Sequence, residues 1–336
     1  MHKQTVSFSK NATNVFFHIL TQCNLNCSHC YINPDQHGHE RLSIERIKAW
    51  LDVLSNRRKN ANVIFLGGEP TLHPDLPAVV NHARKAGYQS VTIDTNGYLF
   101  NDILDKITPE SVDYFSFSLD GATREINDAI RGKGSYDACL TGLEKAVSKG
   151  FNASMIYTVS TANIHELDRM ADLVAGLGID RLFIQVLGIR GRSAQDDTNE
   201  KGAQVTRQQW LDLVPKAAEK IAVHGITVTY PKVFLSPDEP FECAARVADN
   251  YFVFPNGRVY RCPLCEDFAI HSLAFENDQL MQMSKLTEED FFRLDIPEGC
   301  VMNKLVQPDN LQYDADGRPV YQIACCMLKE EVSMGS

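Results

Sequence analysis

The sequence predicts an α/β fold in which a partial (β/α)6 barrel is followed by a small cysteine-rich α+β domain. Short apolar runs alternate with longer amphipathic ones through the first two thirds of the chain. From about residue 232 this alternation stops, and prolines and cysteines become frequent. We therefore expect a barrel domain over residues 1–231 and a second domain over residues 232–336.

The predicted strands are short runs rich in Val, Ile, Phe or Tyr. They are Val15–Leu20, Val63–Leu66, Val91–Thr95, Tyr114–Leu119, Ser154–Val159 and Leu182–Leu187. Strands that alternate with helices imply a parallel sheet with right-handed crossovers. Six strand–helix units are fewer than the eight that close a full TIM barrel, so an open, TIM-like barrel is expected.

The predicted helices lie between these strands and carry apolar residues at helical spacing. They are Ser43–Asn56, Asp75–Ala86, Tyr136–Lys149, Ile164–Leu177 and Gln208–Val223. Ser43 is the expected N-cap of the first helix. Gly87, Gly150 and Gly178 follow three of the helices and mark their expected ends.

Three cysteines follow the first predicted strand. Cys23, Cys27 and Cys30 have the spacing C-x3-C-x2-C. A complete 4Fe-4S cluster takes four thiolates, so three leave one iron open, much as catalytic zinc sites keep an open position. The alternatives are three unrelated cysteines or a structural zinc site completed by a distant residue.

Other polar motifs follow the next predicted strands. Gly67-Gly68-Glu69-Pro70 comes after the second, Asn96 after the third and Ser118 at the end of the fourth, with Arg131 further on. Because the carboxyl ends of parallel strands form one rim of such a barrel, these residues are expected near the cysteines.

The cysteine spacing, with Gly-Gly-Glu about forty residues later, resembles the radical S-adenosylmethionine (SAM) superfamily. The resemblance implies a 4Fe-4S cluster on Cys23, Cys27 and Cys30 whose open iron binds SAM. The reduced cluster then cleaves SAM to a 5′-deoxyadenosyl radical, which takes hydrogen from a substrate. Position 29, usually Tyr or Phe in this family, is His29, and Tyr31 follows the third cysteine.

The resemblance also implies cofactor-binding roles for several residues. Gly68 and Glu69 would meet the methionine amino group of SAM, Gly67 of the same motif would also bind the cofactor, and Ser118 would meet its ribose or carboxylate. Arg131 would pair with the SAM carboxylate or remain a solvated surface charge. Asn96 would line the site or only shape a turn, while His29 and Tyr31 are candidates for contact with the adenine.

The second predicted domain contains further candidate metal ligands, namely Cys243, Cys262, Cys265, Cys300, Cys325 and Cys326. Tyr251–Arg261 is typical of a hairpin that turns at Pro255-Asn256-Gly257, which brings Cys243 and Cys262 close together. The pattern resembles SPASM and twitch domains, which carry auxiliary 4Fe-4S clusters. Six thiols are too few for two fully ligated clusters, so we expect one, held by Cys243, Cys262 and two of the others. A zinc site is the alternative.

The implied function is that of a radical SAM enzyme, an oxidoreductase or modifying enzyme that acts on a peptide or protein to crosslink or oxidise it. The alternatives are dehydrogenation or tailoring of a small molecule or tetrapyrrole, and a non-catalytic iron–sulfur electron-transfer protein. An electron donor such as flavodoxin or ferredoxin is expected. Only 22 residues precede Cys23, so an N-terminal module that binds a leader peptide is not expected.

Composition restricts the partners and the location. The net charge is −10 and no run of Lys and Arg stands out, so no nucleic-acid partner is expected. No apolar run reaches the length of a membrane span, and the N-terminus lacks an apolar signal core. We therefore expect a cytoplasmic protein without a membrane partner, in which the ten cysteines are metal ligands or redox groups more than disulfides.

Overall fold

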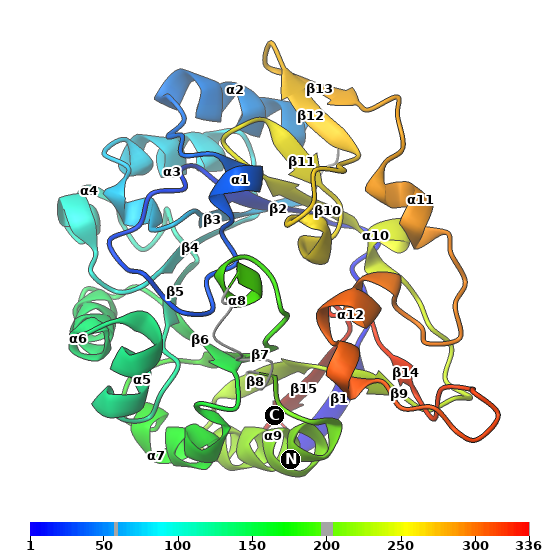
Figure 1. The fold of residues 1–336 in the computed structure, drawn as a ribbon. Coiled ribbons are helices and arrows are strands. Elements are labelled where there is room, and N and C mark those ends of the chain that lie inside the picture. The colour runs from blue at the N-terminus through cyan, green and yellow to red at the C-terminus, as the bar shows by residue number, and fades with distance from the viewer. Residues whose placement is uncertain (57–59, 196–203, 336) are drawn as a thin grey trace.

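The computed structural model describes residues 1–56, 60–195 and 204–335. Its centre is a curved thirteen-stranded sheet in the order β1-β15-β8-β7-β6-β5-β4-β3-β2-β10-β11-β12-β13. Helices from the first two thirds of the chain cover the outside of this sheet (Figure 1). The sheet is open, with β1 and β13 as its edges, and the predicted fold class of a partial barrel is confirmed.

The middle of the sheet is parallel, as the alternation of elements predicted. Its strands are β2 (Thr13–His18), β3 (Ala61–Leu66), β4 (Ser90–Thr95), β5 (Tyr114–Ser118), β6 (Ala153–Val159), β7 (Arg181–Val186) and β8 (Thr227–Pro231). The first six match the predicted strands to within a few residues. The sequence analysis missed β8, whose place in the sheet is fixed from one side by β7 and from the other by β15 at the end of the chain.

The main helices lie on the outer face of the parallel strands. They are α2 (Ile44–Ser55), α3 (Leu76–Lys85), α4 (Ile103–Lys106), α5 (Arg124–Arg131), α6 (Ser135–Ser148), α7 (Met170–Val174) and α9 (Arg207–Ala222), with short α1 (Pro34–His37) and α8 (Arg192–Gln195). Ser43 caps α2 as predicted, since its side chain accepts a hydrogen bond from the Arg46 backbone.

One predicted helix is divided. Instead of one helix over 164–177, the chain forms a 3₁₀ helix at Ile164–Arg169 and then α7. Within the first piece the buried Glu166 accepts hydrogen bonds from the backbone and hydroxyl of Thr123. Contacts to a neighbouring loop therefore shape this turn, which periodicity alone did not indicate.

The last third of the chain extends the same sheet at both edges. At one edge, β10 (Asp249–Val253) pairs with β2 and is followed by β11 (Arg258–Tyr260), β12 (Leu273–Glu276) and β13 (Gln279–Gln282). At the other edge, β15 (Lys329–Ser333) pairs with β8, and the N-terminal strand β1 (His2–Val6) pairs with β15. The predicted hairpin is confirmed as β10 and β11, which turn at Gly257 with a φ of 88°. The predicted boundary after residue 231 stays a prediction, and the sheet runs across it.

The remaining elements of the last third are short. They are β9 (Phe234–Leu235), α10 (Ala244–Val247), a 3₁₀ turn at Pro263–Cys265, α11 (Glu288–Phe292), α12 (Val301–Val306) and β14 (Gln322–Ile323). A small apolar core forms here around Phe254, Tyr260, Leu264 and Met302. A larger core lies between the sheet and the outer helices. Within the described residues, no helix combines the length and the apolar character needed to cross a membrane.

Candidate active site

The three cysteines of the N-terminal motif lie on the loop between β2 and α1 and face a single cavity of about 340 Å³. This volume is within the range of small-molecule sites. Every residue predicted to bind the cofactor also lines this cavity: His29, Tyr31, Gly67, Gly68, Glu69, Asn96, Ser118 and Arg131. The structure thus brings together residues spread over more than one hundred positions of the sequence.

The cysteine loop is held by hydrogen bonds from three other segments. The Asn96 amide donates to the side chain of Asn24 at 2.8 Å, and the Ser28 backbone donates to Ile130. Arg192 donates from its guanidinium to the Cys27 carbonyl at 2.6 Å and from its backbone to the Cys30 carbonyl at 2.9 Å. The backbone of the loop is therefore fixed by contacts that leave the three thiols facing the cavity.

The three thiols differ in exposure. Cys23 is exposed, whereas Cys27 and Cys30 are half-buried. Burial raises the pKa of Cys23 to about 11 and also raises the pKa of Cys27. Both thiols are therefore protonated at neutral pH without a metal, and binding iron would release their protons.

The two glycines of the Gly-Gly-Glu motif allow one loop to pack on another. A Cβ atom at Gly67 would lie 2.5 Å from the Leu20 carbonyl oxygen, and one at Gly68 only 2.2 Å from the Gln22 carbonyl oxygen. No real Cβ makes such contacts with backbone, so any side chain here would push the cysteine loop away. The glycines thus hold the Gly-Gly-Glu turn directly against the start of the cysteine loop.

Glu69 is fully buried beside these glycines. One carboxylate oxygen accepts hydrogen bonds from the backbone and hydroxyl of Thr71 and from the Thr95 hydroxyl. Among the described residues, the other oxygen accepts only from the Asn96 backbone, at 2.7 Å. Because burial raises the pKa of Glu69, a cation in the cavity would stabilise its charged form.

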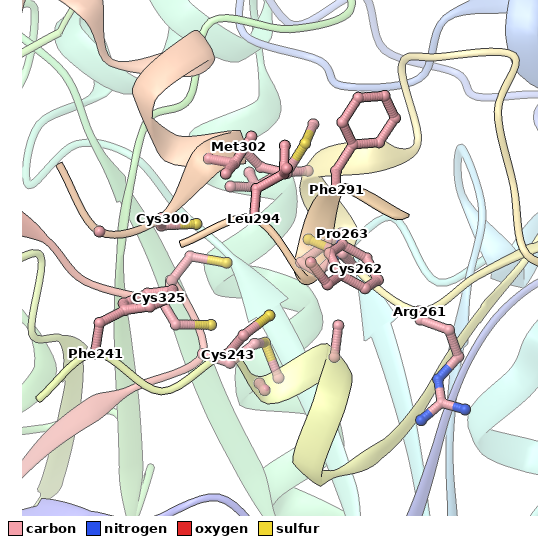
Figure 2. Close-up of a pocket in the computed structure, with 18 residues that line it drawn as sticks. Phe241, Cys243, Arg261, Cys262, Pro263, Phe291, Leu294, Cys300, Met302 and Cys325 are labelled. Atoms are coloured by element: carbon pink, nitrogen blue, oxygen red, sulfur yellow. The ribbon is translucent and has the colours of Figure 1, made fainter. Parts of the chain in front are cut away.

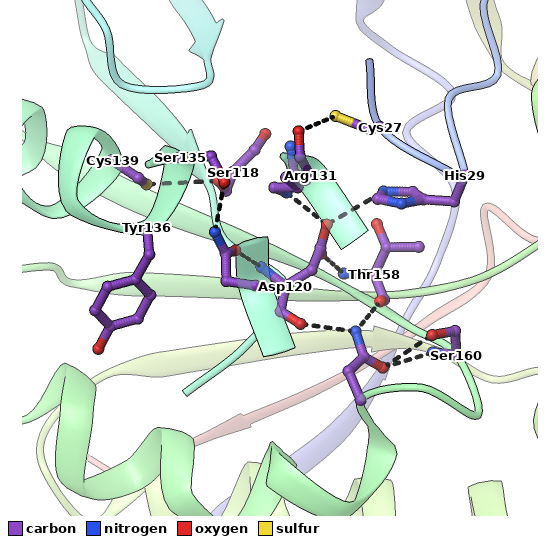
Figure 3. A network of polar contacts seen from close by, with 12 residues as sticks. Cys27, His29, Ser118, Asp120, Arg131, Ser135, Tyr136, Cys139, Thr158 and Ser160 are labelled. Atoms are coloured by element: carbon purple, nitrogen blue, oxygen red, sulfur yellow. Dashed lines mark hydrogen bonds and ion pairs between the residues drawn. The ribbon is translucent and has the colours of Figure 1, made fainter. Parts of the chain in front are cut away.

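Asp120 organises the other side of the cavity, and the sequence analysis did not assign it a role. Its buried carboxylate pairs with Arg131 at 2.6 Å, lies 3.2 Å from the His29 ring and accepts from the Thr158 backbone (Figure 3). Burial alone would raise the pKa of Asp120, but the charges of Arg131 and His29 lower it to about 2. Its only signal in the sequence was the Asp-Gly turn after β5.

This network bears on two predicted contacts with SAM. The Arg131 guanidinium already has a buried carboxylate partner, and the His29 ring is held by the same carboxylate. Both side chains nevertheless line the cavity. Their contacts with the SAM carboxylate and the adenine stay predictions.

Tyr31 joins the cysteine loop to the last third of the chain. Its hydroxyl lies 2.7 Å from the His18 ring, and the Arg190 guanidinium lies over its ring, 4.9 Å from the centroid. Arg190 in turn pairs with the buried Glu266 at 3.0 Å. Burial lowers the pKa of His18 to about 3 and raises that of Glu266 to about 8.

Other polar residues that line the cavity and were not predicted as site residues include Asp94, Gln185 and Lys329. Burial and the nearby Glu69 raise the pKa of Asp94 to about 7. Asp94 lies two residues before Asn96, at the end of the third predicted strand, and Gln185 lies within the sixth predicted strand. Nothing in the sequence connected Lys329 with this site.

A second group of thiols meets in a separate pocket. Figure 2 shows Cys243, Cys262, Cys300 and Cys325 around this pocket, each from a different segment. Cys326 also lines it and, unlike the other four, lines the large cavity as well. Cys265 is buried but lines neither, and its thiol hydrogen-bonds with Cys262 and Glu288.

The second pocket differs from the first in size and lining. Its volume is about 20 Å³, and its other walls include Phe241, Leu264 and Phe292. Among the described residues, no three Cys, His, Asp or Glu side chains are spaced to hold a metal ion as they stand. The donor chemistry fits a metal cluster, but the thiols would have to rearrange to hold one.

Cys139 belongs to neither group. It is fully buried in α6 and its thiol donates to the Ser118 carbonyl at 3.5 Å. Cys139 is therefore a thiol of the apolar core.

Comparison with known proteins identifies the family. Residues 18–174 match the radical SAM superfamily. The mycofactocin maturase MftC of Mycobacterium ulcerans is 30% identical over 285 residues, which are 80% of this chain and 70% of the maturase. The chain belongs to the radical SAM superfamily.

A second relative is named for a different product. The Fe-coproporphyrin III synthase of Methanosarcina barkeri is 32% identical over 240 residues, 70% of this chain and 59% of the synthase. The maturase MftC of Mycobacterium tuberculosis is 33% identical over 272 residues and is matched over 63% of its length. The chain thus spans about 59–63% of these curated relatives.

Solved radical SAM structures share the fold. Streptococcus suis SuiB bound to its precursor peptide SuiA has a TM-score of 0.62 at 14% identity, over 86% of this chain and 66% of SuiB. The enzyme anSMEcpe with bound AdoMet and the Kp18Cys peptide has a TM-score of 0.63 at 13% identity, over 88% of both chains. At this identity the likeness establishes the fold alone.

Proposed function

We propose that this protein is an enzyme that cleaves SAM reductively and uses the resulting radical to take hydrogen from a substrate. The observation that carries the proposal is the single cavity onto which the three cysteines and all eight predicted cofactor residues open. A reduced 4Fe-4S cluster, when bound, supplies the electron that cleaves SAM to methionine and a 5′-deoxyadenosyl radical.

The residues of the chain provide binding, orientation and shielding for this chemistry. Cys23, Cys27 and Cys30 would hold the cluster and leave one iron for SAM. Glu69, buried and with one oxygen accepting a single hydrogen bond, is the acceptor for the SAM ammonium group. The Asp120–Arg131 pair and the His29 ring fix the opposite wall.

We further propose one auxiliary 4Fe-4S cluster in the second pocket. Cys243, Cys262 and Cys300 are three of its ligands, and Cys325 or Cys326 is the fourth, because all of them face that pocket. Cys265 is the spare thiol, since it does not line that pocket and hydrogen-bonds with Cys262 and Glu288. Cys326 lies on the wall between the two pockets, which suits electron transfer between the auxiliary cluster and a substrate radical.

The substrate we propose is a peptide or protein that is crosslinked or oxidised. The maturase name of one relative and the precursor peptide bound to SuiB support this choice. A tetrapyrrole or another small molecule is the second candidate, favoured by the synthase relative at 32% identity. A flavodoxin or ferredoxin as electron donor, and a cytoplasmic location, remain parts of the proposal.

The decisive experiment is anaerobic. The wild type and a Cys23→Ala/Cys27→Ala/Cys30→Ala variant are reconstituted with iron and sulfide, their iron is counted, and 5′-deoxyadenosine is assayed after dithionite and SAM are added. We expect product from the wild type alone, while the variant keeps about one cluster's worth of iron. A wild type that binds zinc, or that holds clusters without cleaving SAM, would indicate a metal-binding or electron-transfer protein instead.

A further inference from the structure

Lys329 lines the large cavity from the end of the strand row that lies away from the cysteine loop. It is the first residue of β15 and pairs with Pro231 at the end of β8. The cysteine loop follows β2, and strands β3 to β8 lie between β2 and β15 in the sheet. Both ends of this row of strands line the same cavity, so Lys329 faces the cavity across from Cys23, Cys27 and Cys30.

Lys329 differs from the other cations of the cavity in having no acidic partner. The guanidinium of Arg131 pairs with Asp120 at 2.6 Å and that of Arg190 with Glu266 at 3.0 Å. Among the described residues, no carboxylate forms an ion pair with Lys329, and its titratable neighbours are the thiols of Cys325 and Cys326.

The side chain of Lys329 is half-buried and lines the cavity. Charges in protein interiors are normally paired, so a cation that lines a cavity without a carboxylate partner is a candidate to bind an anionic ligand.

The lining of the cavity indicates what Lys329 meets. Met327, Leu264 and Phe252 are apolar members of this lining, and Gln185 contributes an amide from β7. An apolar cavity with a few polar groups that fix orientation is typical of a site for an organic ligand. The ammonium of lysine, with three donors and no acceptor, selects an anion.

We propose that Lys329 binds a carboxylate of the substrate and so orients it beside SAM. This inference rests on the proposed function, because it assigns the cavity's far end to the substrate. The carboxylate comes from a peptide or from a small organic acid, and either source presents the same group to the ammonium. The expected interaction is a charge-assisted hydrogen bond in a site shielded from water.

The test measures the reactivity of the Lys329 amine in the reconstituted wild-type protein, so it does not depend on a variant that folds. Cyanate carbamylates the neutral amine, and mass spectrometry of the Lys329 peptide gives the rate. The probes are N-acetylphenylalanine for a peptide carboxylate and 3-phenylpropionate for a small acid. Their uncharged controls are N-acetylphenylalaninamide and 3-phenylpropanamide.

We expect the carboxylates, and not the amides, to slow carbamylation of Lys329, by about twofold when a probe is present at its Kd. The surface residue Lys85 should react at the same rate throughout. The more protective of the two acids identifies the source of the carboxylate. A Lys329→Arg variant, which lacks this amine, confirms which peptide in the mass spectrum contains Lys329.

Three results would overturn the proposal: no protection, equal protection by the amides, or protection that disappears once SAM is bound. The last would assign Lys329 to SAM itself. The outcome is separate from that of the proposed function, which is tested by 5′-deoxyadenosine in the same preparation. Protection without SAM cleavage would leave the carboxylate site in place and remove the enzyme assignment.

Discussion

The two groups of cysteines are built in opposite ways. Cys23, Cys27 and Cys30 come from one eight-residue stretch and open onto a cavity of about 340 Å³ framed by polar groups. The thiols of the second group come from separate segments between residues 243 and 326 and meet in an apolar pocket of about 20 Å³. The first site has room for a ligand beside a cluster, whereas the second has none.

The two cysteine groups therefore depend on the fold to different extents. The first set needs only the β2–α1 loop and the few segments that hold it, such as Asn96 and Arg192. The second set exists only when α10, the β11 end, α12 and the chain before β15 have all packed together. A roomy site suits SAM binding, and a small one suits transfer of electrons without contact with substrate.

The largest effect is expected at the open site. Cys27→Ala removes one of three ligands of the proposed SAM cluster, and we expect the rate of 5′-deoxyadenosine formation to fall by at least about 100-fold, since even outer-sphere changes cost 10–100-fold. Cys139→Ala is the matched control, because this thiol lies in the core outside both pockets. Equal activity of the two variants would remove Cys27 from the ligand set.

The small second pocket is tested by counting iron. In the background lacking Cys23, Cys27 and Cys30, Cys300→Ala should lose the remaining iron, about four atoms per chain, because it removes a proposed auxiliary ligand. Cys265→Ala truncates an equally buried thiol of the same apolar core and should keep that iron. The reverse result would exchange the roles of these two cysteines.

The same contrast explains how much could be predicted from the sequence. The parallel strands, the hairpin at Gly257 and the N-terminal motif are local patterns, so the order and spacing of residues were enough to predict them. The role of Asp120 depends on Arg131 and His29, which approach it from different segments. The positions of β8 and Lys329 depend on the pairing between β8 and β15 at the end of the chain. Such contacts leave no spacing to recognise, so the sequence could not indicate them.

A smaller effect is expected at Asp120, which supports the open site from a segment far from the cysteine loop in sequence. Asp120→Asn leaves the buried Arg131 without its partner, and removing one member of a buried pair costs about 3–5 kcal/mol. Asp105→Asn, in an exposed pair with Lys149, is the control and should cost less than about 1 kcal/mol. Chemical denaturation of both variants measures the difference.

The pH dependence of stability gives an independent check on Asp120. Its pKa is about 2 in the folded protein and about 3.9 in an unfolded chain. A lowered pKa stabilises the fold above the unfolded value, and this contribution is lost as pH falls from about 4 towards 2. The loss of stability over that window should therefore be smaller in Asp120→Asn than in the wild type. An unchanged profile would mean that Asp120 is not charged in the folded state.

The smallest effect is expected from a methyl group added between the Gly-Gly-Glu turn and the cysteine loop. Gly68→Ala places a Cβ 2.2 Å from the Gln22 carbonyl oxygen, and the conflict is with backbone, so the cysteine loop must shift. Overpacking of this kind costs about 1–3 kcal/mol. Gly176→Ala is the control, because its added methyl meets no atom within 4 Å and its backbone needs no positive φ. Thermal unfolding should separate the two variants, and iron in the auxiliary site should be the same in both. If Gly68→Ala lowered auxiliary iron as much as it lowered SAM cleavage, the two sites would not be independent, and the contrast between a locally built site and a fold-dependent one would fail.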